Sequence, residues 1–414
     1  MLTIARGVAW LAAVAWVGLV VARGRFWDST PERLAEPSAD GTAPDVVAVV
    51  PARNEGDVIE RSVGSLVAQR YPGAFHIVVV DDRSDDDTAQ VARSFRDPRV
   101  HYIRNQENLG HLSNYNKGIG LARGQYIWLI SADDRLRRPY VLQRYLDLME
   151  QHPEVGYAFC PGMDLVEGQE TQVLPYSVHG ERDAIFKGRE FLAKLVFRNT
   201  VVSPSGMVRR ECYDISKFPL DMPWGGDWYL WCLFAFHYDV AYFAEPMVCY
   251  RRHNGSMTVL LMDDDLCGCS SEDIAMPWLI KQRAEAMGYR SLIEPCLSAA
   301  AQEYADRIAS KRYRTSHSRL TVEGFERSLE QDTSDPRERN YIRTRTYAAA
   351  ADRYVWQEEY SLARKFYLRS IRYSPWRLRS WFRFFALSMG NVGIGFRKAL
   401  LAVRGLKGES PSKG

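Results

Sequence analysis

Short apolar runs alternate with amphipathic segments along the first half of the chain. Continuous runs rich in β-branched residues indicate strands buried on both faces at 46–50 and 76–80, and we expect further strands at 100–103 and 126–130. Between them, apolar residues recur at helical spacing in the segments 54–69, 88–95 and 112–122, and Asn54 can cap the first of these. This order predicts an α/β domain with a mainly parallel, Rossmann-like sheet and right-handed crossovers.

An uncharged apolar run, residues 7–22, stands near the N-terminus. With the six residues before it, the run is long enough to cross a bilayer, so we predict a transmembrane anchor over 1–25. A cleaved signal peptide and a buried core helix are the alternatives. Cationic residues follow the run more often than they precede it. This bias predicts a single-pass protein of the inner (cytoplasmic) membrane, with the rest of the chain on the cytoplasmic side. The polar stretch 26–44 reads as a linker.

The C-terminal region, 271–414, has a helical pattern to its end. Residues from about 347 to 375 fit the spacing of one tetratricopeptide-like helix pair. The chain's net charge of only +3 hides an uneven distribution, because residues 361–414 carry twelve Lys and Arg against one acid. Tryptophan and phenylalanine are interleaved with these cations, which is typical of a helix on anionic membrane lipid. Plain packed helices remain an alternative. We expect no nucleic-acid partner, because no other feature of the sequence indicates recognition of nucleic-acid bases.

Carboxylates follow two of the predicted strands directly. Asp81 and Asp82 end the strand at 76–80, and Asp133 and Asp134 end the strand at 126–130. The carboxyl ends of parallel strands form the ligand-binding edge of such a sheet. Asp82 could accept a hydrogen bond from a nucleotide base or ribose, while adjacent carboxylates suit a hard divalent cation that holds a diphosphate. A surface turn is the alternative for the second pair. Glycine-rich phosphate-binding motifs of the Rossmann and P-loop types do not occur.

Asp227 stands at the start of an apolar helical segment, in the sequence GGDWYLW. Its charge would be stabilised at a helix N-terminus, so helix capping competes with a role as a general base. Trp224, before the two glycines, is a candidate for stacking on an acceptor sugar. Trp228 and Trp231 are at helical spacing and favour core packing.

Five motifs in this order resemble family 2 glycosyltransferases of the GT-A fold: VVAVVPARNEGDVIE, IVVVDDRSDDDT, NLGHLSNYNKGIGLARGQYIWLISADD, WGGDWYLW and YRRHNGSMT. The resemblance runs from about residue 46 to 258, and we place the catalytic domain at 45–270. It implies a nucleotide-sugar site formed by Pro51, Ala52, Glu55, Asp82, Asn116, Lys117, Asp133 and Arg251. It also implies Asp227 as catalytic base, and Asp134 with His253 as ligands of Mn²⁺ or Mg²⁺.

The sequence therefore predicts an inverting glycosyltransferase. It would move a sugar from a nucleotide-diphosphate donor, expected to be a UDP-sugar, to a hydroxyl of a cell-envelope glycan or lipid-linked acceptor. The opening, from about Trp10 to Phe95, also resembles hopanoid-associated glycosyltransferases. The alternative is a non-catalytic, membrane-bound interaction protein with a degenerate GT-A domain and a helical tail that binds partners.

Overall fold

The computed structural model describes residues 43–253, 256, 259, 261, 266–313 and 319–389. The predicted anchor, nearly all of the predicted linker and the last 25 residues of the basic tail lie outside this set. Within the described residues, no helix is both long and apolar enough to cross a membrane.

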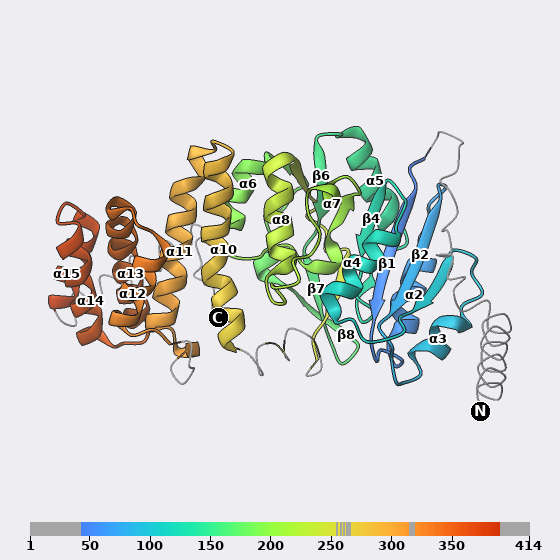
Figure 1. Ribbon diagram of the computed structural model, residues 1–414, viewed down its shortest axis with the longest axis horizontal. Coiled ribbons are helices and arrows are strands. Elements are labelled where there is room, and N and C mark those ends of the chain that lie inside the picture. The colour runs from blue at the N-terminus through green and yellow to red at the C-terminus, as the bar shows by residue number, and fades with distance from the viewer. Residues whose placement is uncertain are drawn as a thin grey trace, which may run out of the picture. The chain divides into compact units, whose positions relative to one another are not determined.

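The larger of two sheets forms the centre of the α/β domain (Figure 1). Within the described residues it has eight strands, in the order β3 (Val100–Arg104), β2 (Phe75–Asp81), β1 (Val46–Ala52), β4 (Tyr126–Leu129), β10 (Met207–Arg209), β6 (Val155–Phe159), β11 (Asp239–Tyr242) and β9 (Ala184–Phe186). The first four strands are parallel, as predicted. β10 is antiparallel to both of its neighbours and β9 is antiparallel to β11. β6 and β11 pair in parallel, so only β10 and β9 run against the other strands. The sheet is thus mixed but mainly parallel, as predicted.

Burial explains why β1 and β2 form in the middle of this sheet. Every residue of β1 is buried, and its β-branched side chains fit a pleated surface covered on both faces. The helices of the domain are α2 (Ile59–Val67), α3 (Thr88–Ser94), α4 (His111–Leu121), α5 (Val141–Gln151), α6 (Gly188–Leu195), α7 (Cys212–Ile215) and α8 (Gly226–His237). Gly118 lets α4 lie close to β1, because a Cβ at this position would stand 2.3 Å from a Val49 methyl carbon. This contact places the N-terminal turns of α4 beside the carboxyl end of β1.

A second sheet, which the sequence did not predict, lies beside the end of β4. It has the order β5 (Arg135–Leu136), β12 (Val248–Arg251), β7 (Gly162–Val166) and β8 (Gln169–Val173). β5 follows Asp134 directly and pairs with β12. The pairing brings the segment that follows β12 back to the carboxylates at the end of β4.

The C-terminal region is helical, as predicted. Its helices are α10 (Leu266–Ala286), α11 (Ile293–Ala309), α12 (Val322–Asp332), α13 (Pro336–Trp356), α14 (Tyr360–Tyr373) and α15 (Leu378–Ser388). They share a core that includes Tyr304, Phe325, Tyr347 and Tyr367. α13 and α14 form the helix pair predicted at about 347–375, and α10 begins a few residues before the predicted boundary at 271. Short 3₁₀ turns complete the described elements: Pro175–Ser177, Ser203–Ser205, Arg290–Leu292 and Lys311–Tyr313.

Candidate active site

Asp133 and Asp134 lie just beyond the end of β4. Asp134 is 2% exposed, and its Oδ1 accepts a hydrogen bond from the backbone N–H of Arg251 at 2.9 Å. The Oδ2 of Asp133 lies 3.1 Å from Nε2 of His253. The end of β12 therefore brings Arg251 and His253 to the two carboxylates, and these four sequence-predicted residues form one cluster.

The electrostatics of this cluster favour a bound cation. Burial, followed by the nearby charge of Asp133, raises the pKa of Asp134 well above its usual range. The same two causes raise the pKa of Glu55 to about 8, although the Arg251 guanidinium lowers the pKa of this carboxyl. Three carboxyl groups thus share a partly buried site with one guanidinium, and a divalent cation would relieve their mutual repulsion.

The side chains that could bind a metal ion fit a cation whose coordination is completed by oxygens of the bound substrate. Among the described residues, no three or more His, Cys, Asp or Glu side chains are grouped so that they could hold a metal ion. Mg²⁺ in nucleotide enzymes is usually held by one or two carboxylates together with substrate phosphates, and carboxylates suit Mn²⁺ as well. Asp133 and Asp134 supply carboxylates of that kind, so diphosphate oxygens would have to fill the remaining positions.

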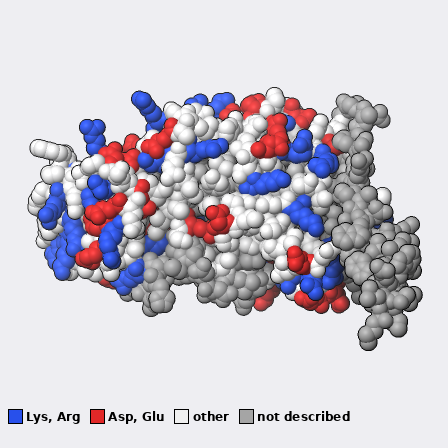
Figure 2. Space-filling model, in the orientation of Figure 1, with Lys and Arg blue, Asp and Glu red and all other residues white. Residues whose placement is uncertain are grey.

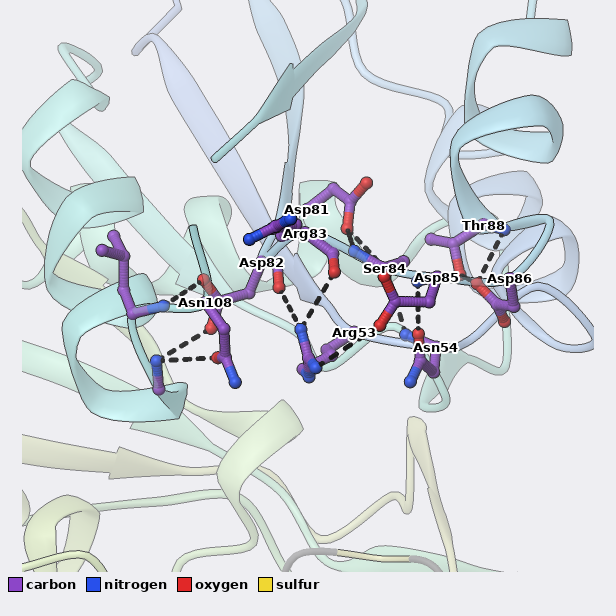
Figure 3. Close-up of polar contacts among 12 residues, drawn as sticks. Arg53, Asn54, Asp81, Asp82, Arg83, Ser84, Asp85, Asp86, Thr88 and Asn108 are labelled. Carbon is purple, nitrogen blue, oxygen red and sulfur yellow. Dashed lines mark hydrogen bonds and ion pairs between the residues drawn. The ribbon is translucent and has the colours of Figure 1, made fainter. Parts of the chain in front are cut away.

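The loops that follow β1 and β2 are joined by a hydrogen-bond network (Figure 3). Nη1 of Arg53 donates to the backbone oxygens of Asp82, at 2.6 Å, and Arg83, at 3.0 Å. The backbone N–H of Asn54 donates to Oγ of Ser84 at 2.9 Å. These contacts fix the polar end of β1 against the polar end of β2, where the nucleotide was predicted to bind.

Asn54 does not cap a helix, and that part of the sequence prediction is wrong. The helix α2 begins at Ile59, and its N-cap position, Val58, provides no side-chain hydrogen bond. Asn54 has a φ of +55°, a conformation that Asn adopts more readily than most residues. Its Oδ1 accepts the backbone N–H of Asp85 at 2.9 Å. The side chain therefore links two loops.

Asp82 is 2% exposed and holds the loop at residues 105–110. Its carboxylate accepts hydrogen bonds from Nδ2 of Asn105 (2.7 Å) and from the backbone N–H groups of Leu109 (2.8 Å) and Gly110 (2.9 Å). A carboxylate offers about four acceptor positions, so three are already in use. Contact between Asp82 and a base stays a prediction, and anchoring of the loop is a function that the sequence did not reveal.

The other predicted donor-site residues lie on β1 and α4. Pro51 and Ala52 are buried at the carboxyl end of β1, and the oxygen of Pro51 accepts the N–H of Ala132 at 3.2 Å, next to the carboxylate cluster. The Nζ of Lys117 donates to Oδ1 of Asn105 at 2.7 Å. Lys117 therefore lies beside Asn105, which donates a hydrogen bond to the Asp82 carboxylate. Its contact with a diphosphate stays a prediction.

Asn116 contacts the protein backbone through both polar atoms of its side chain. Nδ2 donates to the oxygen of Phe218 at 2.8 Å, and Oδ1 accepts the N–H of Phe218 at 2.9 Å. This pair of bonds ties α4 to the loop that leads to α8. A ribose contact for Asn116 stays a prediction.

Asp227 lies in the first turn of α8, as predicted. Its Oδ2 accepts a hydrogen bond from Nδ2 of Asn199 at 3.1 Å, and its Oδ1 accepts from the backbone N–H of Trp228 at 2.6 Å. Burial raises the pKa of Asp227 to about 6, against the lowering effect of these two hydrogen bonds. Such a carboxyl is largely ionised at neutral pH and remains basic enough to accept a proton.

Tyr115, on α4, is a residue of this region that the sequence did not reveal. Its ring packs edge-on against the ring of Phe218, with the ring centroids 5.3 Å apart. Burial raises its pKa, and the charges of Asp133, Asp134 and Asp227 all add to the effect. Tyr115 is therefore within electrostatic range of both the carboxylate cluster and Asp227. Only its presence in NYNKG could have pointed to it.

The loop before α8 is held by α10. The indole N–H of Trp224 donates to Oδ1 of Asp273 at 2.9 Å, and the N–H of Gly225 donates to Oε2 of Glu272 at 2.6 Å. Glu272 therefore serves the N-terminus of α8 in place of a local cap. Stacking of Trp224 on an acceptor stays a prediction. Trp228 and Trp231 are buried core residues, as expected.

The family model for glycosyl transferase family 2 matches residues 47–210, which include the loops after β1, β2 and β4. Residues 47–210 are therefore similar to the glycosyl transferase family 2 domain. Asp227, Arg251 and His253 follow the matched segment, and their place in the candidate site rests on the geometry above.

Curated relatives match parts of this chain. An uncharacterised Mycobacterium tuberculosis protein is 39% identical over 124 residues, which are 30% of this chain and 38% of that protein. The succinoglycan biosynthesis protein ExoO of Rhizobium meliloti is 40% identical over 111 residues (27% and 31%). The Campylobacter jejuni GalNAc(5)-diNAcBac-PP-undecaprenol beta-1,3-glucosyltransferase is 29% identical over 153 residues (36% and 48%). The chain thus spans less than half the length of each of these relatives.

Solved structures show the fold. Residues 1–349 of S. aureus TarS, in complex with UDP-GlcNAc, superpose with a TM-score of 0.56 at 14% identity, over 79% of this chain and 91% of that one. The same TarS fragment without the sugar nucleotide gives 0.53. The domain is therefore an α/β, GT-A-like fold with a mixed, mainly parallel sheet and a C-terminal helical region, as the sequence predicted. The predicted transmembrane segment lies outside the described residues and stays a prediction.

Proposed function

We propose that this protein is an inverting glycosyltransferase that moves a sugar from a nucleotide-diphosphate donor, a UDP-sugar, to a hydroxyl of a cell-envelope glycan or lipid-linked acceptor. One observation carries the proposal: the ends of β4 and β12 bring Asp133 and Asp134 together with Arg251 and His253. The charges of Asp133, Asp134 and Asp227 all raise the pKa of Tyr115, which supports one site with a diphosphate-binding end and a proton-accepting end.

The chemistry follows from this arrangement. Asp227 removes the proton of the acceptor hydroxyl as the hydroxyl oxygen attacks the anomeric carbon of the donor. The bond from that carbon to the diphosphate breaks, and the diphosphate leaves with the electron pair. Arg251 lies where it can stabilise the leaving charge. A divalent cation, Mn²⁺ or Mg²⁺, held by Asp134 with Asp133 and His253, would supply further charge neutralisation.

The names of two relatives and the N-terminal apolar run support the acceptor class and the cellular site. The relatives' names refer to succinoglycan biosynthesis and to an undecaprenol-linked glycan. We propose an acceptor of that envelope class. The apolar run at residues 7–22, outside the described residues, supports an inner-membrane protein with its catalytic domain on the cytoplasmic side.

Donor binding tests the proposal. In a thermal-shift panel of UDP-, GDP- and dTDP-sugars, we expect a UDP-sugar with Mn²⁺ to raise the melting temperature by several degrees, because a ligand at about 100 times its Kd stabilises by roughly 2.7 kcal/mol. The matched nucleoside monophosphate, which lacks the second phosphate, should give a smaller shift. No shift with any nucleotide sugar, with or without metal, would contradict the proposal.

The pH dependence of turnover should report the protonation of the Asp227 carboxylate. Its pKa is raised to about 6, so kcat/KM should fall about tenfold per pH unit below that value, as the base becomes protonated. Asn199→Asp removes the hydrogen-bond donor and adds a like charge. Both changes raise the pKa of Asp227, so the acidic limb should move to higher pH. Asn340→Asp, on the exposed surface of α13, is the matched control and should leave the limb in place. A limb that Asn199→Asp does not move would exclude Asp227 as the titrating group.

A further inference from the structure

An exposed apolar stripe runs along the outer face of α15. Leu378, Phe382, Phe385 and Met389 are 79%, 54%, 55% and 66% exposed. Their spacing of four, three and four residues places them on one side of the helix and its last turn. Trp376, just before the helix, is 90% exposed. A large contiguous patch of exposed apolar side chains is more often an interaction surface than a surface that stays in contact with water.

The opposite side of α15 is part of the folded core. Ser380, Ala386 and Leu387 are buried, and Leu387 belongs to the apolar core of the helical region. Nε1 of Trp381 donates to the oxygen of Pro375 at 2.8 Å, which fixes the turn that precedes the helix. α15 is thus held in place with its stripe facing outward.

Positive charge surrounds the stripe. Residues 360–389 contain no acid and seven cationic residues: Arg364, Lys365, Arg369, Arg372, Arg377, Arg379 and Arg383. Figure 2 shows Lys and Arg side chains beside uncharged surface at the end of the molecule where α14 and α15 lie. The crowding is electrostatically unfavourable: after burial, the charges of Arg345, Arg383 and Arg379 lower the pKa of Arg377. An anionic partner would relieve it.

We propose that the outer faces of α14 and α15 dock on an anionic lipid bilayer, with the apolar stripe at the acyl boundary and the cations among the headgroups. A bilayer satisfies both features, whereas a nucleic acid would leave Leu378 and Met389 in water. A second copy of the chain would place cations against cations. This inference does not depend on the proposed catalytic activity.

Vesicle binding by the full chain tests the proposal. We expect it to sediment with phosphatidylcholine vesicles containing phosphatidylglycerol about tenfold more strongly than the Leu378→Glu/Phe385→Glu variant does. The matched control, Val178→Glu/Leu220→Glu, makes the same change at exposed apolar residues of the catalytic domain and should bind like the unchanged protein. Equal sedimentation of all three proteins, together with unchanged tryptophan quenching in the measurement that follows, would overturn the proposal.

A second measurement locates the contact even if the N-terminal apolar run also binds lipid. Brominated acyl chains quench tryptophan fluorescence on contact, so Trp376→Phe should reduce the quenching by anionic vesicles. Unchanged quenching would show that Trp376 does not reach lipid. If light scattering without vesicles shows that the Leu378→Glu/Phe385→Glu variant dissociates an oligomer, the stripe is an interface between copies of the chain and the proposal is wrong.

Discussion

Replacing Asp227 by Asn should lower sugar transfer by about 10³-fold while donor binding stays nearly unchanged, because general-base catalysis contributes roughly 10² to 10⁴. The amide has the size of the carboxyl but cannot accept the acceptor's proton. Since burial raises the pKa of Asp227, its charge is unfavourable in the folded protein, and the neutral amide should not destabilise the fold. The measurement is release of the nucleoside diphosphate, alongside the donor-induced shift in melting temperature.

Asp221→Asn is the matched control for this variant. Asp221 is exposed in the loop that precedes α8, so the same loss of charge should leave the rate unchanged. Near-normal transfer by Asp227→Asn would refute its role as base. A loss of donor binding equal to the loss of rate would instead place Asp227 among the donor-binding residues.

Asp134→Asn should abolish the Mn²⁺-dependent part of donor binding and reduce transfer by at least about 10²-fold, because removing a carboxylate from a site with few protein ligands removes most of the cation's hold. The folded protein without ligands should be as stable as before or more so. Burial and the charges of Asp133 and Glu55 disfavour the ionised Asp134, and the amide removes that repulsion. Melting temperatures with and without Mn²⁺ and donor measure both effects.

Asp85→Asn tests whether the effect of Asp134→Asn is specific. Asp85 belongs to the neighbouring acidic loop, and its side chain is 77% exposed. The melting temperature of the Asp85→Asn variant should respond to Mn²⁺ and donor like that of the unchanged protein. If Asp134→Asn lowered the melting temperature of the ligand-free protein, the Asp134 carboxylate would be structural, through its bond to the Arg251 N–H, and the metal assignment would lose its support.

The sequence predicts the parallel half of the sheet well because burial on both faces leaves a strong signal. β1 is a continuous β-branched run, and all of its residues are buried. β9 and β10 have only three residues each, too few for a periodicity. β8, with the sequence QETQV, is mostly exposed and carries no apolar pattern. The mixed half and the second sheet therefore depend on tertiary pairing that no local segment specifies.

The candidate site likewise contains residues with a local sequence signal and residues that only tertiary contacts identify. Asp82, Asp133, Asp134 and Asp227 stand directly at strand or helix ends, where sequence position reveals them. The residues that form hydrogen bonds within the site are not revealed by sequence position. Glu272 accepts a hydrogen bond from Gly225, 47 residues away in the chain, and Asn199 donates one to Asp227, 28 residues away. Such contacts arise only when the chain is folded, and Glu272 and Asn199 carry no local signal that separates them from surface residues.

Donor hydrolysis in the absence of acceptor tests the central claim most directly. With water as the attacking nucleophile, ¹H NMR can identify the first-formed anomer of the sugar released from an α-linked UDP-sugar by the full-length protein. In-line displacement with Asp227 as base predicts that the β-anomer appears first, together with UDP, before mutarotation. First appearance of the α-anomer would contradict the proposed single displacement.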